Sequence, residues 1–253
     1  MLCRRPRRQR FCAEDGAGSF HNKMKTIKNE KLIKRNAKIG QWLSLGALAV
    51  LGAGMYISFT RVDLFAYSIA ALVVGFTMTQ IGMYFSNRWG RSPRIDEQLD
   101  AALKGLSNED AIYHFVTPVP HLFVGAAGVW VLLPFHQRGK VTYYKNRWRL
   151  TGGGFMQAYM TIFGQEGIGR PDLEMEAQIN SVKKYLAKQM DENEIPEIQG
   201  ALVFTSGQVE IDTTDAPAPA LKIKQLKEFI RQKGRALGSP TLEKIKSALP
   251  QEI

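Results

Sequence analysis

The chain has 253 residues and a formal net charge of +11, a length that accommodates one soluble domain of ordinary size together with a membrane anchor. Its two cysteines lie within the first twelve residues, which excludes a disulfide framework and a cysteine-rich zinc site in the rest of the chain. The charge is unevenly distributed: residues 1–38 hold twelve Lys/Arg and three Asp/Glu, a net of +9, and the remainder carries only +2. This distribution disfavours a nucleic-acid-binding domain, which needs a concentrated basic face.

Residues 1–38 are interpreted as a basic cytoplasmic tail. A lysine-rich run begins at Met24 and differs in composition from residues 1–23. We therefore expect Met24 to be the physiological start of the protein. Each Lys or Arg beside an anionic leaflet adds roughly 1 kcal/mol of attraction. The expected partner of the tail is therefore a lipid bilayer with anionic headgroups.

Two uncharged segments follow the tail, over residues 39–59 and 64–85. At about 1.5 Å per helical residue, each segment spans roughly 30 Å, the thickness of the hydrocarbon core of a bilayer. Two such segments in tandem favour a pair of transmembrane helices over a buried core helix of a soluble protein.

The charged residues that flank the two segments predict their orientation. Four basic residues precede the first segment and three follow the second: Lys31, Lys34, Arg35, Lys38, Arg88, Arg91 and Arg94. The connection between the segments carries only Arg61, which Asp63 offsets. Because flanks rich in Lys and Arg stay in the cytoplasm, the sequence predicts a protein integral to the cell membrane with both termini cytoplasmic.

Small and aromatic side chains predict how this hairpin packs. Small residues that allow close helix approach occur in the first segment, at Gly46, Ala49, Gly52, Ala53 and Gly54. Aromatic rings suited to a membrane interface occur near the segment ends, at Trp42, Tyr84 and Trp89. We expect two antiparallel helices joined by a very short loop.

Residues 92–235 predict one cytoplasmic α/β domain, and residues 236–253 a short C-terminal helix over 241–249. Apolar residues three and four apart predict helices over 92–106, beginning at Ser92 and Pro93, over 171–190 and over 221–233. Runs of β-branched and aromatic residues predict strands over 111–117, 122–124, 129–135, 140–144 and 198–205, with 209–211 as a candidate partner of the last. This order predicts a mixed sheet flanked by helices.

The stretch from Pro120 to Trp148 resembles the core of the nuclease-related domain (NERD) family, which has a strand ending in an Asp-containing turn, a strand with Glu-x-Lys, then Gly-Lys and a Trp. Pro171, the helix with Gln178 and the strand over 200–206 correspond to the Pro/Gln helix and final core strand of that family. The resemblance covers roughly residues 95–233 and implies a restriction-endonuclease-like fold.

Nucleases of that fold hold Mg²⁺ with two or three carboxylates and use a Lys to position or activate the attacking water. Aligned on the family, the Asp slot falls near Pro120 and His121, the Glu slot on Leu133 and the Lys slot on Phe135. Residues 111–165 contain no Asp or Glu, so a shifted alignment does not restore the site. The resemblance therefore implies a degenerate domain, a pseudoenzyme.

Two alternatives remain open at the level of sequence. A metal-dependent nuclease would recruit carboxylates from elsewhere, such as Glu166, Asp172 or Glu174. A nucleic-acid-binding or lipid-binding module would use a basic hairpin interleaved with aromatic rings, whose cations are Lys140, Lys145, Arg147 and Arg149. A solvated strand face near anionic headgroups is the plainer interpretation of that hairpin.

No other motif points to chemistry. The glycines at 152–154 lack the residues of a phosphate-binding loop, and His114, His121 and His136 show no metal-ligand spacing. The sequence thus predicts a membrane-anchored, non-catalytic interaction or scaffold protein that needs no cofactor and no metal and binds an unknown protein partner.

Overall fold

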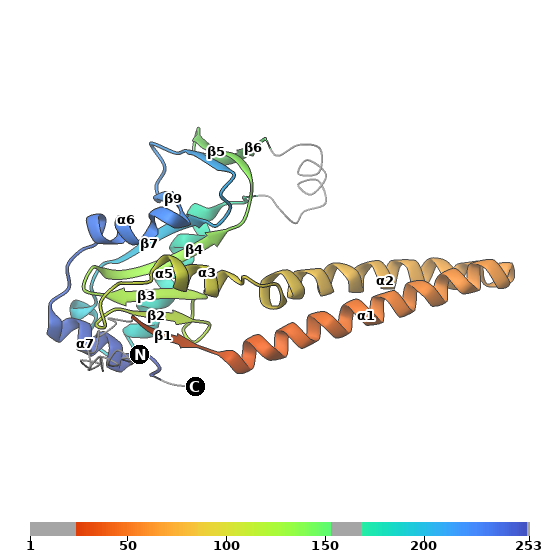
Figure 1. Ribbon diagram of the computed structural model, residues 1–253, viewed down its shortest axis with the longest axis horizontal. Helices are drawn as coiled ribbons and strands as arrows, with labels where there is room; N and C mark the ends of the chain where they lie inside the picture. Colours follow the sequence, from red (N-terminus) through yellow and green to blue (C-terminus); the bar gives the residue numbers. More distant parts are fainter. Residues whose placement is uncertain (1–23, 153–167, 252–253) are drawn as a thin grey trace, which may run out of the picture.

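The computed structural model describes residues 24–152 and 168–251. An elongated helical hairpin projects from an α/β domain (Figure 1). Residues 1–23 of the predicted tail and Glu166 lie outside the described ranges.

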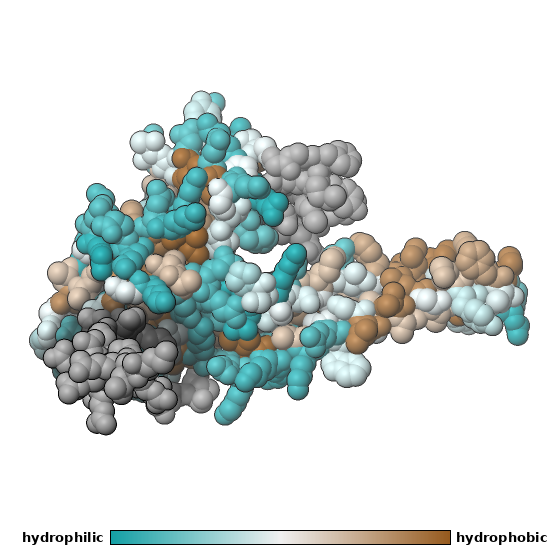
Figure 2. Space-filling view, in the orientation of Figure 1, coloured by the Kyte–Doolittle hydropathy of each residue, from teal (hydrophilic) through white to brown (hydrophobic). Residues whose placement is uncertain are grey.

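The hairpin consists of α1 (Glu30–Thr60) and α2 (Phe65–Phe85), joined by a single 3-10 turn (Val62–Leu64). Both predicted apolar segments are helical, and both helices are long and apolar enough to cross a membrane. Only 11% and 6% of their most apolar stretches are buried, whereas a core helix of a soluble protein would be mostly buried. Figure 2 shows hydrophobic side chains along the projecting hairpin and mostly hydrophilic ones over the domain.

Small residues form the seam between the two helices. Every seventh residue of α1 from Ile33 onward is buried, namely Ile33, Gly40, Ala47 and Gly54, and the buried residues of α2 are Gly75 and Gly82. A Cβ added at Gly54 would lie 2.7 Å from the Cβ of Ala71, while one at Gly52 would meet nothing within 4 Å. Of the predicted packing residues, Gly54 and Gly46 are confirmed, since a Cβ at Gly46 would lie 2.9 Å from Cε of Met78, whereas Gly52, Ala49 and Ala53 are exposed.

The main sheet has six strands in the order β1-β2-β3-β4-β7-β9. Its strands are β1 (Lys25–Lys28), β2 (Ala111–His114), β3 (His121–Gly125), β4 (Gly128–Phe135), β7 (Ile198–Phe204) and β9 (Ala220–Lys222). Neighbours β2, β3 and β4 run antiparallel, while β1 with β2, β4 with β7 and β7 with β9 run parallel. The edge strand β1 belongs to the stretch predicted as a tail, so part of that stretch folds with the domain.

A second sheet has three strands in the order β6-β5-β8, from β5 (Gly139–Tyr144), β6 (Arg147–Thr151) and β8 (Val209–Asp212). Strand β8 runs parallel to β5. The prediction that 209–211 pairs with the preceding strand is therefore wrong, because the chain leaves the main sheet after Phe204 and β8 pairs with β5 in the second sheet.

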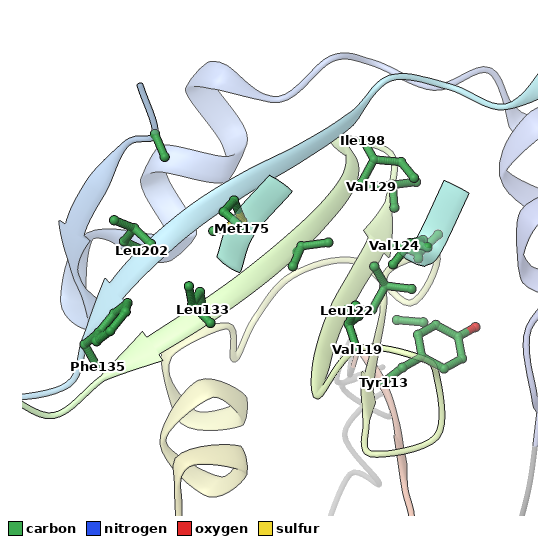
Figure 3. Packing of buried hydrophobic residues seen from close by; sticks show 14 of the residues in the cluster. Tyr113, Val119, Leu122, Val124, Val129, Leu133, Phe135, Met175, Ile198 and Leu202 are labelled. Atoms are coloured by element: carbon green, nitrogen blue, oxygen red, sulfur yellow. The ribbon is translucent and has the colours of Figure 1, made fainter. Parts of the chain in front are cut away.

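Helices cover both faces of the main sheet. Helices α5 (Pro171–Leu186) and α7 (Ser239–Ala248) pack on one face, with Met175, Leu133 and Leu202 in its core (Figure 3). Helices α3 (Ile95–Ala102) and α6 (Leu226–Lys233) pack on the other. The predicted mixed sheet flanked by helices is confirmed.

Helices α3 and α6 start later than predicted. Helix α3 begins after Arg94 rather than at Ser92, and the Glu97 side chain accepts a hydrogen bond from the Arg94 backbone N–H at 3.0 Å. The predicted helix over 221–233 starts only at Leu226, because residues 220–222 form strand β9 and a 3-10 turn follows.

Candidate functional site

A row of polar side chains crosses three strands of the main sheet on the face covered by α3. The register places Lys28 of β1 opposite His114 of β2, and His114 opposite His121 of β3. The two histidines are almost completely buried, at 0% and 2% exposure. Such burial of imidazoles is uncommon and requires hydrogen-bond partners.

Helix α3 supplies those partners. Asp96 and Asp100 are four residues apart, so both project from one side of the helix. The Asp100 carboxylate lies 3.0 Å from Nε2 of His114 and also pairs with Lys28. Asp96, at 2% exposure, accepts hydrogen bonds from Lys28 at 3.3 Å and from the Arg94 guanidinium at 3.0 and 3.1 Å.

We call this set of six residues the junction cluster: Lys28, Arg94, Asp96, Asp100, His114 and His121. It ties the strand that precedes the first long helix to the helix that follows the second. Its charged members balance one another, which is the condition under which buried charges are tolerated.

The hydrogen bonds of His114 and His121 indicate which of their ring nitrogens carry protons. Because a carboxylate only accepts hydrogen bonds, Nε2 of His114 carries the proton that it shares with Asp100. The Nδ1 atoms of His114 and His121 are 2.7 Å apart, so one of them is protonated. With both rings neutral, Nδ1 of His121 donates this hydrogen bond and Nδ1 of His114 accepts it.

Burial and charge act in opposite directions on the pKa values of these groups. Burial opposes the charge of Asp96, yet Arg94 and Lys28 outweigh it and hold the pKa of its carboxyl below 3.8. Burial likewise opposes the charge of Lys28, yet Asp100 and Asp96 raise its pKa above 10.5. For His121, burial and then His114 lower the pKa well below 6.5.

These directions predict a loss of stability in mild acid. The unfolded chain protonates His121 near pH 6.5 and the folded protein does not, so the stabilisation is complete above pH 6.5 and is lost as the pH falls below it. The loss is at most about 1.4 kcal/mol per pH unit. Unfolding of the full-length protein at pH 7.5 and 5.5 measures it. His121→Gln is expected to reduce the dependence, and an unchanged dependence in that variant would contradict the assignment.

Aromatic rings connect the junction cluster to the hairpin. A π-helical turn (Ser86–Gly90) follows α2 and carries Trp89, whose ring lies 4.4 Å from that of Phe115. Phe115 in turn contacts His121 at 5.0 Å between ring centroids. Trp89 is only 8% exposed, so its ring packs within the protein rather than facing outward as an interfacial ring would. Trp42 and Tyr84 are 73% and 53% exposed, as interface residues would be.

No family model matches the chain, and no curated protein or solved structure matches it either.

The positions that the resemblance aligns with the nuclease Asp, Glu and Lys lie at the start of β3 and on its neighbour β4. Leu133 and Phe135 are core residues that pack with Met175 and Leu202 on the α5 face (Figure 3). His121 precedes Leu122, which also faces that core, so the alternation of a strand places His121 on the α3 face. Pro120, beside it, is partly exposed and accepts a backbone hydrogen bond from Phe115.

The basic hairpin is formed by β5 and β6. Lys140, Lys145, Arg147 and Arg149 are all exposed, and Lys145 lies over the ring of Tyr144 at 5.4 Å. On the other side of β5, Glu210 of β8 is opposite Lys140, and Asp212 forms an ion pair with Lys140 at 3.1 Å. The cations are therefore bordered by an acidic strand that the sequence did not place there.

Carboxylates in the described ranges form no cluster of three that would hold a metal ion. Asp172 pairs with Arg170 at 3.2 Å, and Glu174 accepts a hydrogen bond from Gln178. Both lie in the first turn of α5, where acidic side chains favour a helix start.

From the sequence, His114, His121 and His136 could converge in space but were expected to be surface or strand residues, and the structure brings His114 and His121 together. The sequence did not single out Lys28, Asp96 or Asp100 as partners of these histidines, and it placed Arg94 only among the flanking cations. The sequence did contain one indication of this cluster. Asp96 and Asp100 lie on a short helix that was predicted only from its apolar residues, among them the buried Leu99. Two acids spaced by four residues on a short helix indicate a charged partner across the contact.

Proposed function

We propose that the chain is a membrane-anchored, non-catalytic interaction or scaffold protein that carries a degenerate nuclease-related domain of restriction-endonuclease-like fold. Its hairpin crosses the cell membrane twice, and the domain and both termini lie in the cytoplasm. Its partners are a bilayer with anionic headgroups and a protein that docks on the domain.

The observation that carries this proposal is the exposure of the apolar hairpin. Side chains such as Phe59, Tyr67 and Leu72 are 81%, 67% and 61% exposed. Soluble proteins rarely expose an apolar surface of this extent, whereas a helix that spans a bilayer does so along its length. The basic residues lie at the domain end of the hairpin and only Arg61 at the turn, which supports the cytoplasmic orientation.

The order of elements in the domain supports the nuclease-related assignment. Helix α3, the antiparallel strands β2, β3 and β4, helix α5 and the parallel strand β7 follow one another in the order that the resemblance implies. The carboxylate and the lysine that cleavage would need are missing from the corresponding positions of β4. Leu133 and Phe135 stabilise the core where the family has a carboxylate and a Lys.

A nuclease assay tests the non-catalytic part. Full-length protein in detergent is incubated with DNA and with RNA, each with Mg²⁺ or Mn²⁺. We expect cleavage no faster than in a matched buffer preparation. Cleavage that Asp172→Ala or Glu166→Ala abolishes would replace the proposal with a metal-dependent nuclease. Salt-sensitive nucleic-acid binding lost in Arg147→Ala/Arg149→Ala would instead favour the binding module.

A further inference from the structure

We infer that the start of α1 holds one anionic phospholipid, with its phosphate on Arg35 and Lys38 and its acyl chain along Ile39, Trp42 and Leu43. The inference rests on the proposed membrane anchor and names the lipid class that one face of it recognises.

The five residues lie on one face of α1 and line a hollow of about 460 Å³. Counted from Arg35, the others follow at three, four, seven and eight residues, the spacing of one helical face. Trp42 is 73% exposed and Ile39 is 38% exposed. The hollow thus lies at the surface of the anchor, where lipid reaches it.

The two cations at this hollow are unengaged. Neither Arg35 nor Lys38 forms an ion pair with a carboxylate in residues 24–152 or 168–251, whereas Lys34, on the neighbouring face, pairs with Glu30 at 3.0 Å. Lys28 and Arg94 are committed to the junction cluster. Arg35 and Lys38 therefore have donors available for a phosphate, and an Arg fork binds phosphate oxygens in a bidentate manner.

The order of residues along the helix matches the order of groups in a phospholipid. Arg35 and Lys38 precede the uncharged stretch, and Trp42 lies about 10 Å further along the axis than Arg35. Cations that reach the phosphate, an aromatic ring at the interface and apolar side chains beyond it reproduce the sequence phosphate, glycerol, acyl chain. A soluble phosphate would use only the first of these three contacts.

Native mass spectrometry of the full-length protein in detergent, titrated with dioleoyl phosphatidylglycerol and with dioleoyl phosphatidylcholine, tests the site. We expect the first phosphatidylglycerol to bind more tightly than phosphatidylcholine. Arg35→Ala/Lys38→Ala should weaken phosphatidylglycerol binding by about thirtyfold, the equivalent of about 2 kcal/mol. Binding of phosphatidylcholine should stay the same.

The matched control is Lys31→Ala/Lys34→Ala, which removes the same charge at the same spacing on the same helix. It should change phosphatidylglycerol binding by less than about threefold, because neither residue lines the hollow and Lys34 already pairs with Glu30. Equal losses in both double variants, no loss in Arg35→Ala/Lys38→Ala, or displacement of the lipid by glycerol phosphate would each overturn the inference.

Flotation with phosphatidylcholine vesicles separates the two proposals. If the wild-type protein does not float, the membrane anchor itself fails. If it floats and the Arg35→Ala/Lys38→Ala variant keeps its preference for phosphatidylglycerol, only the lipid site fails.

Discussion

Replacing Asp96 with alanine is expected to lower the free energy of unfolding of the domain by about 3 kcal/mol, because it leaves two cations beside a buried vacancy. Asp96 is 2% exposed and accepts hydrogen bonds from both Lys28 and Arg94. Those cations keep partial access to water, which places the cost at the lower end for a broken buried pair. Urea titration of the full-length protein in detergent, followed by tryptophan fluorescence, measures the change.

Asp212→Ala is the matched control for Asp96→Ala. It also removes one carboxylate from an ion pair, with Lys140 at 3.1 Å, but both partners are about half exposed. Surface pairs of this kind contribute at most about 1 kcal/mol. Similar losses in the two variants would show that the junction cluster does not stabilise the fold through its buried charges.

Replacing Gly54 with leucine is expected to separate α1 from α2 locally and to destabilise the hairpin by about 2–3 kcal/mol. The added Cβ would lie 2.7 Å from the Cβ of Ala71, and both atoms are fixed to helix backbone. The Ser68 hydroxyl also donates a hydrogen bond to the Gly54 carbonyl at 2.9 Å, a contact that requires close helices. Unfolding by sodium dodecyl sulfate in mixed micelles measures the effect.

Gly52→Leu provides the comparison two residues away. A Cβ there meets nothing within 4 Å, so the side chain extends into lipid or detergent. Its unfolding should differ from that of the wild-type protein by less than about 0.5 kcal/mol. A loss in Gly52→Leu as large as that in Gly54→Leu would mean that leucine disrupts helix α1 itself and not the seam.

The parts of the structure that sequence predicts best are those fixed by local pattern. The two apolar segments predict α2 and the apolar part of α1 without any knowledge of tertiary contacts. Helix α1 itself begins nine residues before its predicted segment, at Glu30, within the stretch assigned to the tail. The same holds for α5, where Pro171 starts the helix and Met175 and Val182 mark its buried face.

Non-local pairing explains most of what the sequence did not predict. Strand β1 has four residues, two of them lysines, and is a strand only because β2, more than eighty residues away, pairs with it. Strand β8 was assigned to the wrong neighbour because adjacency in sequence was taken as adjacency in the sheet. Tertiary context decides such short strands.

The junction cluster was missed for the same reason. His114 and His121 are seven residues apart, and they meet because the intervening turn reverses the chain and sets the register of β2 against β3. Trp89 was assigned to the membrane interface because it lies only a few residues after the second apolar segment. In the structure its ring packs against that of Phe115.

Alkaline carbonate extraction of membranes from cells that express the full-length protein is the most direct test of the anchor. Carbonate at high pH strips proteins held by charge alone and leaves those held by apolar helices in the bilayer. We predict that the protein remains in the membrane pellet and enters solution only with detergent, because two helices long and apolar enough to cross a bilayer have most of their side chains unburied within the protein. Recovery of the protein in the carbonate supernatant would contradict the account.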